Sequence, residues 1–177
     1  MISLKIVSKN LLNIKSGIIV VPFFQDIIPS RGSLSRIDWL MSNRISHLIL
    51  SEKLSGNYMG RGLFCNSDKF ITDKILLIGM GKSSTFDIKR IFNISSSVID
   101  ILSKIKIYDF SIELIGKNIV SLEPYLIFEQ MVKGFIKKTK ERDIVIHIAE
   151  EDDLIYKMLA ETAAQIIPNY KGSLTLA

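Results

Sequence analysis

The sequence predicts an α/β fold in which a mostly parallel β-sheet lies between two layers of helices. Apolar segments of strand length alternate with segments whose apolar residues recur at helical spacing. Residues 17–24 form a continuous apolar run, which is typical of a strand covered on both faces. The chain has 177 residues and is 47% hydrophobic, enough for one domain with its own core. We therefore expect a three-layer α/β/α sandwich, formed as a single domain by residues 1–177.

The strands are predicted from apolar runs and from the alternation of apolar and polar residues. They are expected over residues 2–8, 17–24, 62–67, 74–80, 109–116 and 142–150. A loop around Pro29, Arg31 and Gly32 follows the second strand, because these residue types interrupt regular structure. Right-handed crossovers would bring the loops that follow the parallel strands to one edge of the sheet, where open α/β sheets bind ligands.

The helices are predicted from apolar stripes at a spacing of three and four residues. They are expected over residues 33–48, 88–105, 125–135 and 154–167. Ser33 is the candidate N-cap of the first helix, and Trp39 lies beside its stripe, which predicts partial burial. The acidic residues 150–153 precede the last helix, where they complement the helix dipole without any need for a metal ion.

The charge and cysteine content limit which binding partners and which cellular compartment are expected. The net charge of +5 is compatible with an anionic partner. Lysines at 133, 137, 138 and 140 gather on one helix face but lack interleaved aromatic residues, so nucleic acid is not an expected partner. Cys65 is the only cysteine and cannot form an internal disulfide, which predicts a reducing, cytoplasmic setting. Its thiol is expected to be buried and inert. No apolar run is long enough to span a membrane, so no membrane association is expected.

The segment KILLIGMGKSSTFD, residues 74–87, resembles a phosphate-binding loop but departs from the known patterns. A P-loop needs glycine five positions before its Gly-Lys pair, where this chain has Leu76. A dinucleotide loop needs a third glycine where the chain has Ser84. The segment therefore predicts a strand-to-helix turn, with Ser84 or Thr85 as the helix cap. If a ligand site exists, we expect it at this turn and the neighbouring strand end, with an anion bound by Gly79, Gly81, Lys82, Ser83, Ser84, Phe24 and Asp26.

The two histidines do not form a metal-binding or catalytic pattern. His147 alternates with Ile146 and Ile148 along a predicted strand, so it faces away from them and is expected to be a partly buried structural residue. No serine occupies a nucleophile elbow, and Cys65 has no base at a recognisable spacing. The residues themselves thus indicate no catalytic site, metal site or cofactor.

Six segments together resemble the N-terminal domain of leucyl aminopeptidases, peptidase family M17. In order they read GIIVVPFFQD, RGSLSRID, LSGNYMGRG, KILLIGMGKSSTFD, MVKGFIKKTK and AETAAQIIPN. The family shows an apolar strand ending in phenylalanine and an acidic residue, and later a strand ending in Gly-x-Gly. It also has a helix with a central glycine, matched here by Gly134. The resemblance covers nearly the whole chain and implies a macro-domain-like α/β/α sandwich.

The resemblance also implies what this chain lacks. The metal ions and catalysis of the family belong to a C-terminal domain with the motif Asn-Thr-Asp-Ala-Glu-Gly-Arg, which does not occur in this sequence. We expect no enzyme but a non-catalytic module that binds a protein partner, a second copy of itself or an anionic small ligand. One alternative is a fragment or regulatory subunit of a metal-dependent leucyl aminopeptidase. Another is a macro-like binder of a nucleotide or ADP-ribose-type ligand, although the acidic adenine contact and phosphate loops of macro domains have no evident counterpart here.

Overall fold

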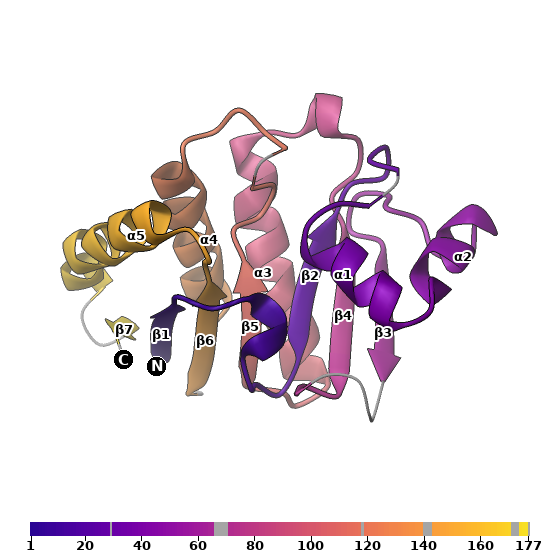
Figure 1. Ribbon diagram of the computed structural model, residues 1–177. Helices are drawn as coiled ribbons and strands as arrows, with labels where there is room; N and C mark the ends of the chain where they lie inside the picture. Colours follow the sequence, from indigo (N-terminus) through magenta and orange to yellow (C-terminus); the bar gives the residue numbers. More distant parts are fainter. Residues whose placement is uncertain (29, 66–70, 118, 140–142, 171–173, 177) are drawn as a thin grey trace.

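The protein folds around one seven-stranded sheet with helices on both faces (Figure 1). The computed structural model describes residues 1–28, 30–65, 71–117, 119–139, 143–170 and 174–176. The strand order is β3-β4-β2-β5-β6-β1-β7, and every neighbouring pair is parallel except β3 and β4. The predicted α/β sandwich with a mostly parallel, mixed sheet is therefore confirmed.

The strands lie close to the predicted segments. They are β1 (Ile2–Val7), β2 (Ile19–Phe23), β3 (Arg61–Cys65), β4 (Lys74–Gly79), β5 (Asp109–Glu113), β6 (Ile144–Ala149) and β7 (Leu174–Leu176). The short strand β7 was not predicted; it extends the sheet beside β1. In β6, Ile146 and Ile148 are fully buried and His147 faces the other way, as the alternation predicted.

The helices divide between the two faces of the sheet. They are α1 (Ser33–Leu40), α2 (Arg44–Leu50), α3 (Ile88–Lys104), α4 (Pro124–Lys138) and α5 (Asp153–Ile166), with short 3-10 turns η1 (Leu11–Asn13), η2 (Ser83–Thr85) and η3 (Ile167–Tyr170). The larger core cluster joins α3, α4 and α5 to one face of the sheet. A smaller cluster joins α1, α2 and η1 to the other face, mainly over β2 and β4 (Figure 1).

The single helix predicted over residues 33–48 is wrong, because the chain turns sharply between α1 and α2. Ser42 and Asn43 adopt left-handed backbone angles, with φ of 57° and 60°. The buried carboxylate of Asp38 accepts hydrogen bonds from the backbone N–H groups of Ile45 (2.8 Å) and Ser46 (3.0 Å), and also from the Ser46 hydroxyl. Asp38 thus satisfies the free donors at the start of α2 and stabilises a second helix start.

Replacing Asp38 by alanine should lower the free energy of unfolding by about 2 kcal/mol, since buried backbone donors would lose their acceptor. Asp38→Asn keeps one acceptor oxygen and should cost clearly less. Urea unfolding of both variants measures the difference. Equal stabilities of the alanine variant and the parent would show that the carboxylate does not hold the second helix.

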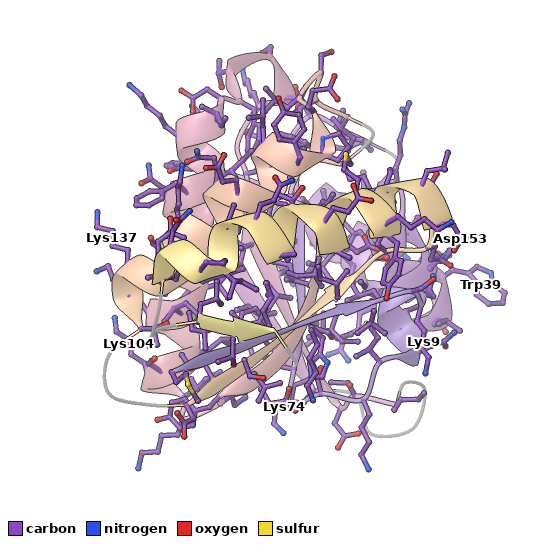
Figure 2. The ribbon with its side chains drawn as sticks, turned by 90° about the vertical axis from the view of Figure 1, so that its left-hand side faces the viewer. Lys9, Trp39, Lys74, Lys104, Lys137 and Asp153 are labelled. Atoms are coloured by element: carbon purple, nitrogen blue, oxygen red, sulfur yellow. The ribbon has the colours of Figure 1, made fainter. Side chains whose placement is uncertain are left out.

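Three side-chain predictions also fail. Ser33 does not cap α1: its hydroxyl bonds to Glu113, and α1 has Gly32 at the N-cap position with no side-chain cap. Trp39 is 75% exposed and projects from the surface (Figure 2), because it lies just outside the buried stripe. Cys65 is exposed because β3 is an edge strand of the described sheet. The environment of each of these three side chains depends on the tertiary fold, which the local sequence does not reveal.

The cap of α3 is also not the residue that was expected. Asp87, and not Ser84 or Thr85, accepts a hydrogen bond from the backbone N–H of Arg90 at 2.9 Å. Ser83–Thr85 instead form the 3-10 turn η2. The cap of α3 therefore lies two or three residues later in the chain than expected.

Candidate functional site

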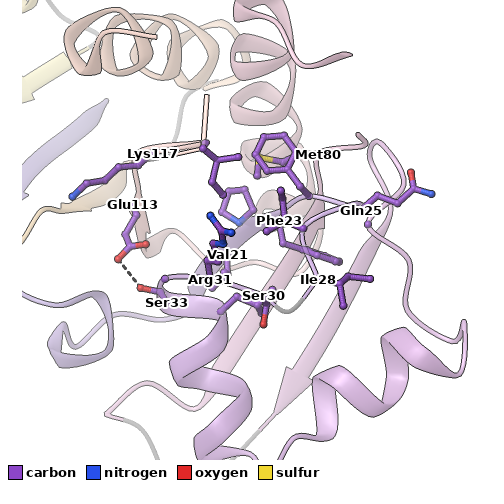
Figure 3. A pocket seen from close by; sticks show the side chains of 18 of the residues that line it. Val21, Phe23, Gln25, Ile28, Ser30, Arg31, Ser33, Met80, Glu113 and Lys117 are labelled. Atoms are coloured by element: carbon purple, nitrogen blue, oxygen red, sulfur yellow. Dashed lines mark hydrogen bonds between the residues drawn. The ribbon is translucent and has the colours of Figure 1, made fainter. Parts of the chain in front are cut away.

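A cavity of about 480 Å³ opens where β2 and β5 end (Figure 3). Its walls come from the segment after β2, the first turn of α1, part of α2 and the loop after β5. In the view of Figure 3 the charged side chains of Arg31, Glu113 and Lys117 lie toward one side, and Phe23 and Met80 toward the other. A cavity of this size and mixed lining is typical of small-molecule sites.

Arg31 is the free cation of this cavity. Its side chain is exposed, and it forms no ion pair with any residue that the structure describes. It stands two residues before α1, whose N-cap residue Gly32 has a positive φ of 62° and offers no side chain to the first turn. The first backbone N–H groups of a helix have no partner within the helix and carry partial positive charge. Arg31 and the start of α1 together make this side of the cavity suited to an anion.

Glu113, the last residue of β5, adds an acid to the same wall. Its carboxylate accepts a hydrogen bond of 2.6 Å from the Ser33 hydroxyl. Burial raises the pKa of the Glu113 carboxyl above its ordinary value of 4.5, although the Ser33 hydrogen bond and the charge of Lys117 oppose the shift. A raised pKa lets the carboxyl hold its proton more readily than an exposed glutamate does.

Lys117 lines the cavity, but its charge is already neutralised. Its ammonium group pairs with Oε1 of Glu150, a carboxylate whose side chain is fully buried at the end of β6. The same oxygen accepts a hydrogen bond of 2.9 Å from the backbone N–H of Asp152. Glu150 therefore ties the loop after β5 to the start of α5. Within the acidic run 150–153, whose charges were expected to complement the helix dipole, Asp152 caps α5 and Glu150 forms this ion pair.

The glycine turn after β4 is built mainly for close backbone packing. The N–H groups of Gly79 and Gly81 donate to the carbonyls of Gly60 and Gly56, at 2.7 and 2.8 Å. The donors at the start of η2 are already satisfied by a carboxylate of the protein. Asp26 accepts hydrogen bonds from the backbone N–H (2.8 Å) and the hydroxyl (2.9 Å) of Ser83. These bonds, the backbone one first, lower the pKa of Asp26.

The predicted site residues thus divide into two groups. Phe24 lines the cavity and packs against Phe86, with ring centroids 5.0 Å apart. The remaining members are not among the described residues that line the cavity: Gly79, Gly81, Lys82, Ser83, Ser84 and Asp26. Binding of an anion by these residues stays a prediction. Sequence reasoning missed Arg31, although a cation and a glycine directly before a helix start are a usable signal.

Other candidate groups are engaged in contacts within the protein. Nε2 of His147 lies 2.9 Å from Oδ1 of Asp109 on the neighbouring strand. On the lysine face of α4, Lys133 pairs with Glu129, Lys138 pairs with Asp100 and Lys137 lies over the Phe92 ring; Lys140 is outside the described residues.

The described residues contain neither a metal-binding cluster nor a helix able to span a membrane. They contain no cluster of three or more His, Cys, Asp or Glu placed to hold a metal ion. No helix within them has the length and hydropathy needed to cross a bilayer.

Comparison with known proteins identifies the fold. No protein-family model matches the sequence, and no curated protein matches it. An Oceanobacillus iheyensis macrodomain with ADP matches at a TM-score of 0.74 and 11% identity, covering 93% of this chain and 91% of the macrodomain. A Trypanosoma brucei macrodomain in complex with ADP matches at 0.71 and 11% identity, covering 92% of this chain and 68% of that one. The chain has the macrodomain fold.

The resemblance to leucyl aminopeptidases is supported only through this macrodomain fold. A tomato leucine aminopeptidase mutant matches at a TM-score of 0.61 and 13% identity, covering 94% of this chain. The chain spans only 37% of that aminopeptidase. The two macrodomains match with higher TM-scores. The structural comparison therefore supports the macrodomain fold and does not support a specific relation to the aminopeptidase domain.

Proposed function

We propose that this protein binds a nucleotide or ADP-ribose-type ligand in the cavity at the ends of β2 and β5. The observation that carries the proposal is the Arg31 guanidinium, which has no ion-pair partner among the described residues and lies at the uncapped start of α1, inside a cavity of about 480 Å³. A diphosphate would accept charge-assisted hydrogen bonds from Arg31 and from the first N–H groups of α1. The apolar side, with Phe23 and Met80, would contact the base.

Two further points support this assignment. The loop after β5 turns at Gly116, whose φ of 77° brings the chain back along the cavity wall. This loop adds Gly116 and Lys117 to the lining of the cavity beside Glu113. The two macrodomains named above were solved with ADP, a ligand of the class proposed here. We propose a binding role for this cavity.

Isothermal titration calorimetry with ADP-ribose, ADP and inorganic phosphate tests the proposal. Saturable binding of ADP-ribose or ADP with a stoichiometry near one supports it, together with much weaker binding of phosphate, since phosphate alone fills only the anion side. Chemical-shift changes should centre on the first turn of α1 and the loop after β5. The absence of binding at millimolar ligand would refute the proposal.

The affinity for ADP-ribose should fall as the pH rises through the pKa of Glu113. An ionised Glu113 would repel the diphosphate, so the bound state favours the protonated carboxyl and binding takes up a proton. Because this pKa is raised above 4.5, the loss should begin above that pH and reach roughly fivefold or more. ADP-ribose is the suitable probe, since its pyrophosphate diester does not titrate near neutrality.

Glu113→Gln supplies the control for this pH dependence. Glutamine can still accept the Ser33 hydrogen bond but carries no charge, so the variant should bind ADP-ribose with a nearly constant affinity from acidic to neutral pH. Calorimetry across that range compares the two proteins. An unchanged slope in the variant would assign the pH dependence to a group other than Glu113.

A further inference from the structure

The edge strand β3 presents both its backbone and one side-chain face to solvent. It pairs with β4 only, in antiparallel register, with Leu63 opposite Leu76. The N–H of Gly79 donates to the carbonyl of Gly60, and hydrogen-bonded pairs alternate along an antiparallel ladder. The backbone groups of Arg61, Leu63 and Cys65 therefore point away from β4, where no described strand pairs with them.

The side chains of Arg61 and Leu63 line an apolar groove. A hollow of about 240 Å³ runs between β3 and the last turn of α3, lined by Leu63, Leu76, Ile101 and Ile105 with Arg61 and Lys104. Leu63 is 51% exposed and Ile105 is 40% exposed. The groove exists because α3 covers β4 but does not reach across β3. An open edge with exposed apolar residues is the usual feature of a strand-addition site.

Three cations lie at or near the groove, and none of them has an acidic partner among the described residues. Arg61 and Lys104 line it, and Lys74 stands opposite Cys65 in the register. None of the three forms an ion pair with a residue that the structure describes. Lys74 and Lys104 both extend outward in the lower part of Figure 2. A second copy of this chain would bring the same cations face to face, which disfavours pairing of two β3 edges.

We propose that β3 is a docking edge for an extended acidic segment of a partner protein. The segment adds as an eighth strand beside β3, so that its backbone pairs with Arg61, Leu63 and Cys65. Every second side chain of the segment then faces the groove. The middle one is apolar and lies beside Leu63; of the two carboxylates that flank it, one pairs with Arg61 and the other with Lys74 and Lys104. This surface is separate from the cavity and does not depend on the proposed function.

The test uses the peptide acetyl-Thr-Glu-Thr-Leu-Thr-Glu-Thr-amide and a matched peptide with lysine in place of each glutamate. Fluorescence anisotropy of labelled peptides should show binding of the acidic peptide that weakens as salt is added, and at least tenfold weaker binding of the basic one. Cys65 is the only thiol of the chain, so its reaction with a thiol reagent reports on the edge directly. Saturating acidic peptide should slow that reaction at least fivefold.

The variant Arg61→Glu should weaken binding of the acidic peptide at least tenfold. Lys157→Glu, the same charge change on the exposed side of α5, should leave it within twofold. Binding that leaves the reactivity of Cys65 unchanged, or that both variants weaken equally, would overturn the proposal. So would a failure of the acidic peptide to bind at millimolar concentration. A concentration-dependent dimer in sedimentation that protects Cys65 would overturn it in favour of a second copy.

Discussion

Arg31→Ala should weaken binding of ADP-ribose by roughly 10- to 150-fold. A hydrogen bond to a charged group contributes about 1.5–3 kcal/mol, and this side chain is the one cation of the cavity lining that the described residues leave unpaired. The fold should not suffer, because Arg31 is exposed and forms no ion pair with a described residue. Calorimetry at one fixed ionic strength gives the dissociation constants, and a thermal melt confirms that the variant is folded.

Lys82→Ala is the matched control for this experiment. It removes one exposed positive charge from the same edge of the sheet, but Lys82 is not among the described residues that line the cavity. Its affinity for ADP-ribose should stay within about twofold of the parent, as screening weakens such distant charges. The opposite result, a loss with Lys82→Ala and none with Arg31→Ala, would place the ligand at the glycine turn and contradict the cavity assignment.

Gly79→Ala should destabilise the protein by about 3–5 kcal/mol, the upper end of what single substitutions do. A methyl group at this position would lie 2.1 Å from the carbonyl oxygen of Asn57 and 2.7 Å from the carbonyl carbon of Gly56. Both are backbone atoms, so a whole loop would have to move. The Gly79 N–H and carbonyl groups also hold that loop, through Gly60 and Met59.

Gly62→Ala provides a comparison within the same sheet. Its added methyl group would meet the ends of the Leu54 and Phe64 side chains at 3.0 and 3.1 Å, and those can shift. A cost of about 1 kcal/mol or less is expected, partly offset because alanine loses less backbone entropy than glycine. Urea unfolding of both variants gives the free energies. Similar losses in the two would show that the loop over Gly79 yields as easily as side chains do.

The sheet could be predicted from the sequence because its strands are long apolar runs. β2 and β4 are buried on both faces, so their composition alone indicates central strands. The break between α1 and α2 could not be predicted in this way. Leu34, Ile37, Met41 and Ile45 keep helical spacing across the turn, since both short helices pack on the same smaller core. Periodicity indicates which residues are buried. Here the pattern of buried residues continues across the turn, although the helix is interrupted there.

The candidate site was harder to predict because its parts are far apart in the chain. Arg31 follows β2, whereas Glu113 ends β5 and Lys117 follows it. The partner of Lys117 is Glu150, after β6. Only the parallel order β2-β5-β6 brings these three strand ends side by side. The glycine turn at 79–81 resembles a phosphate-binding motif in sequence. In the structure, its glycines allow the close approach of a neighbouring backbone segment. A sequence motif consists of residues close together in the chain. The residues that line this cavity come from separate loops, so no single motif identifies them.

The position of β1 in the sheet has a consequence for how the chain folds. Its neighbours are β6, more than 140 residues later, and β7, which begins at Leu174. During synthesis β1 therefore emerges before the other described strands, and it has no described strand to pair with until β6, which ends at Ala149, has been made. The apolar Ile2 and Leu4, fully buried in the finished core, are exposed throughout that interval. Pairing over such a distance in sequence is slow, so closure of the sheet around β1 should be the late step of folding and the stage most open to aggregation.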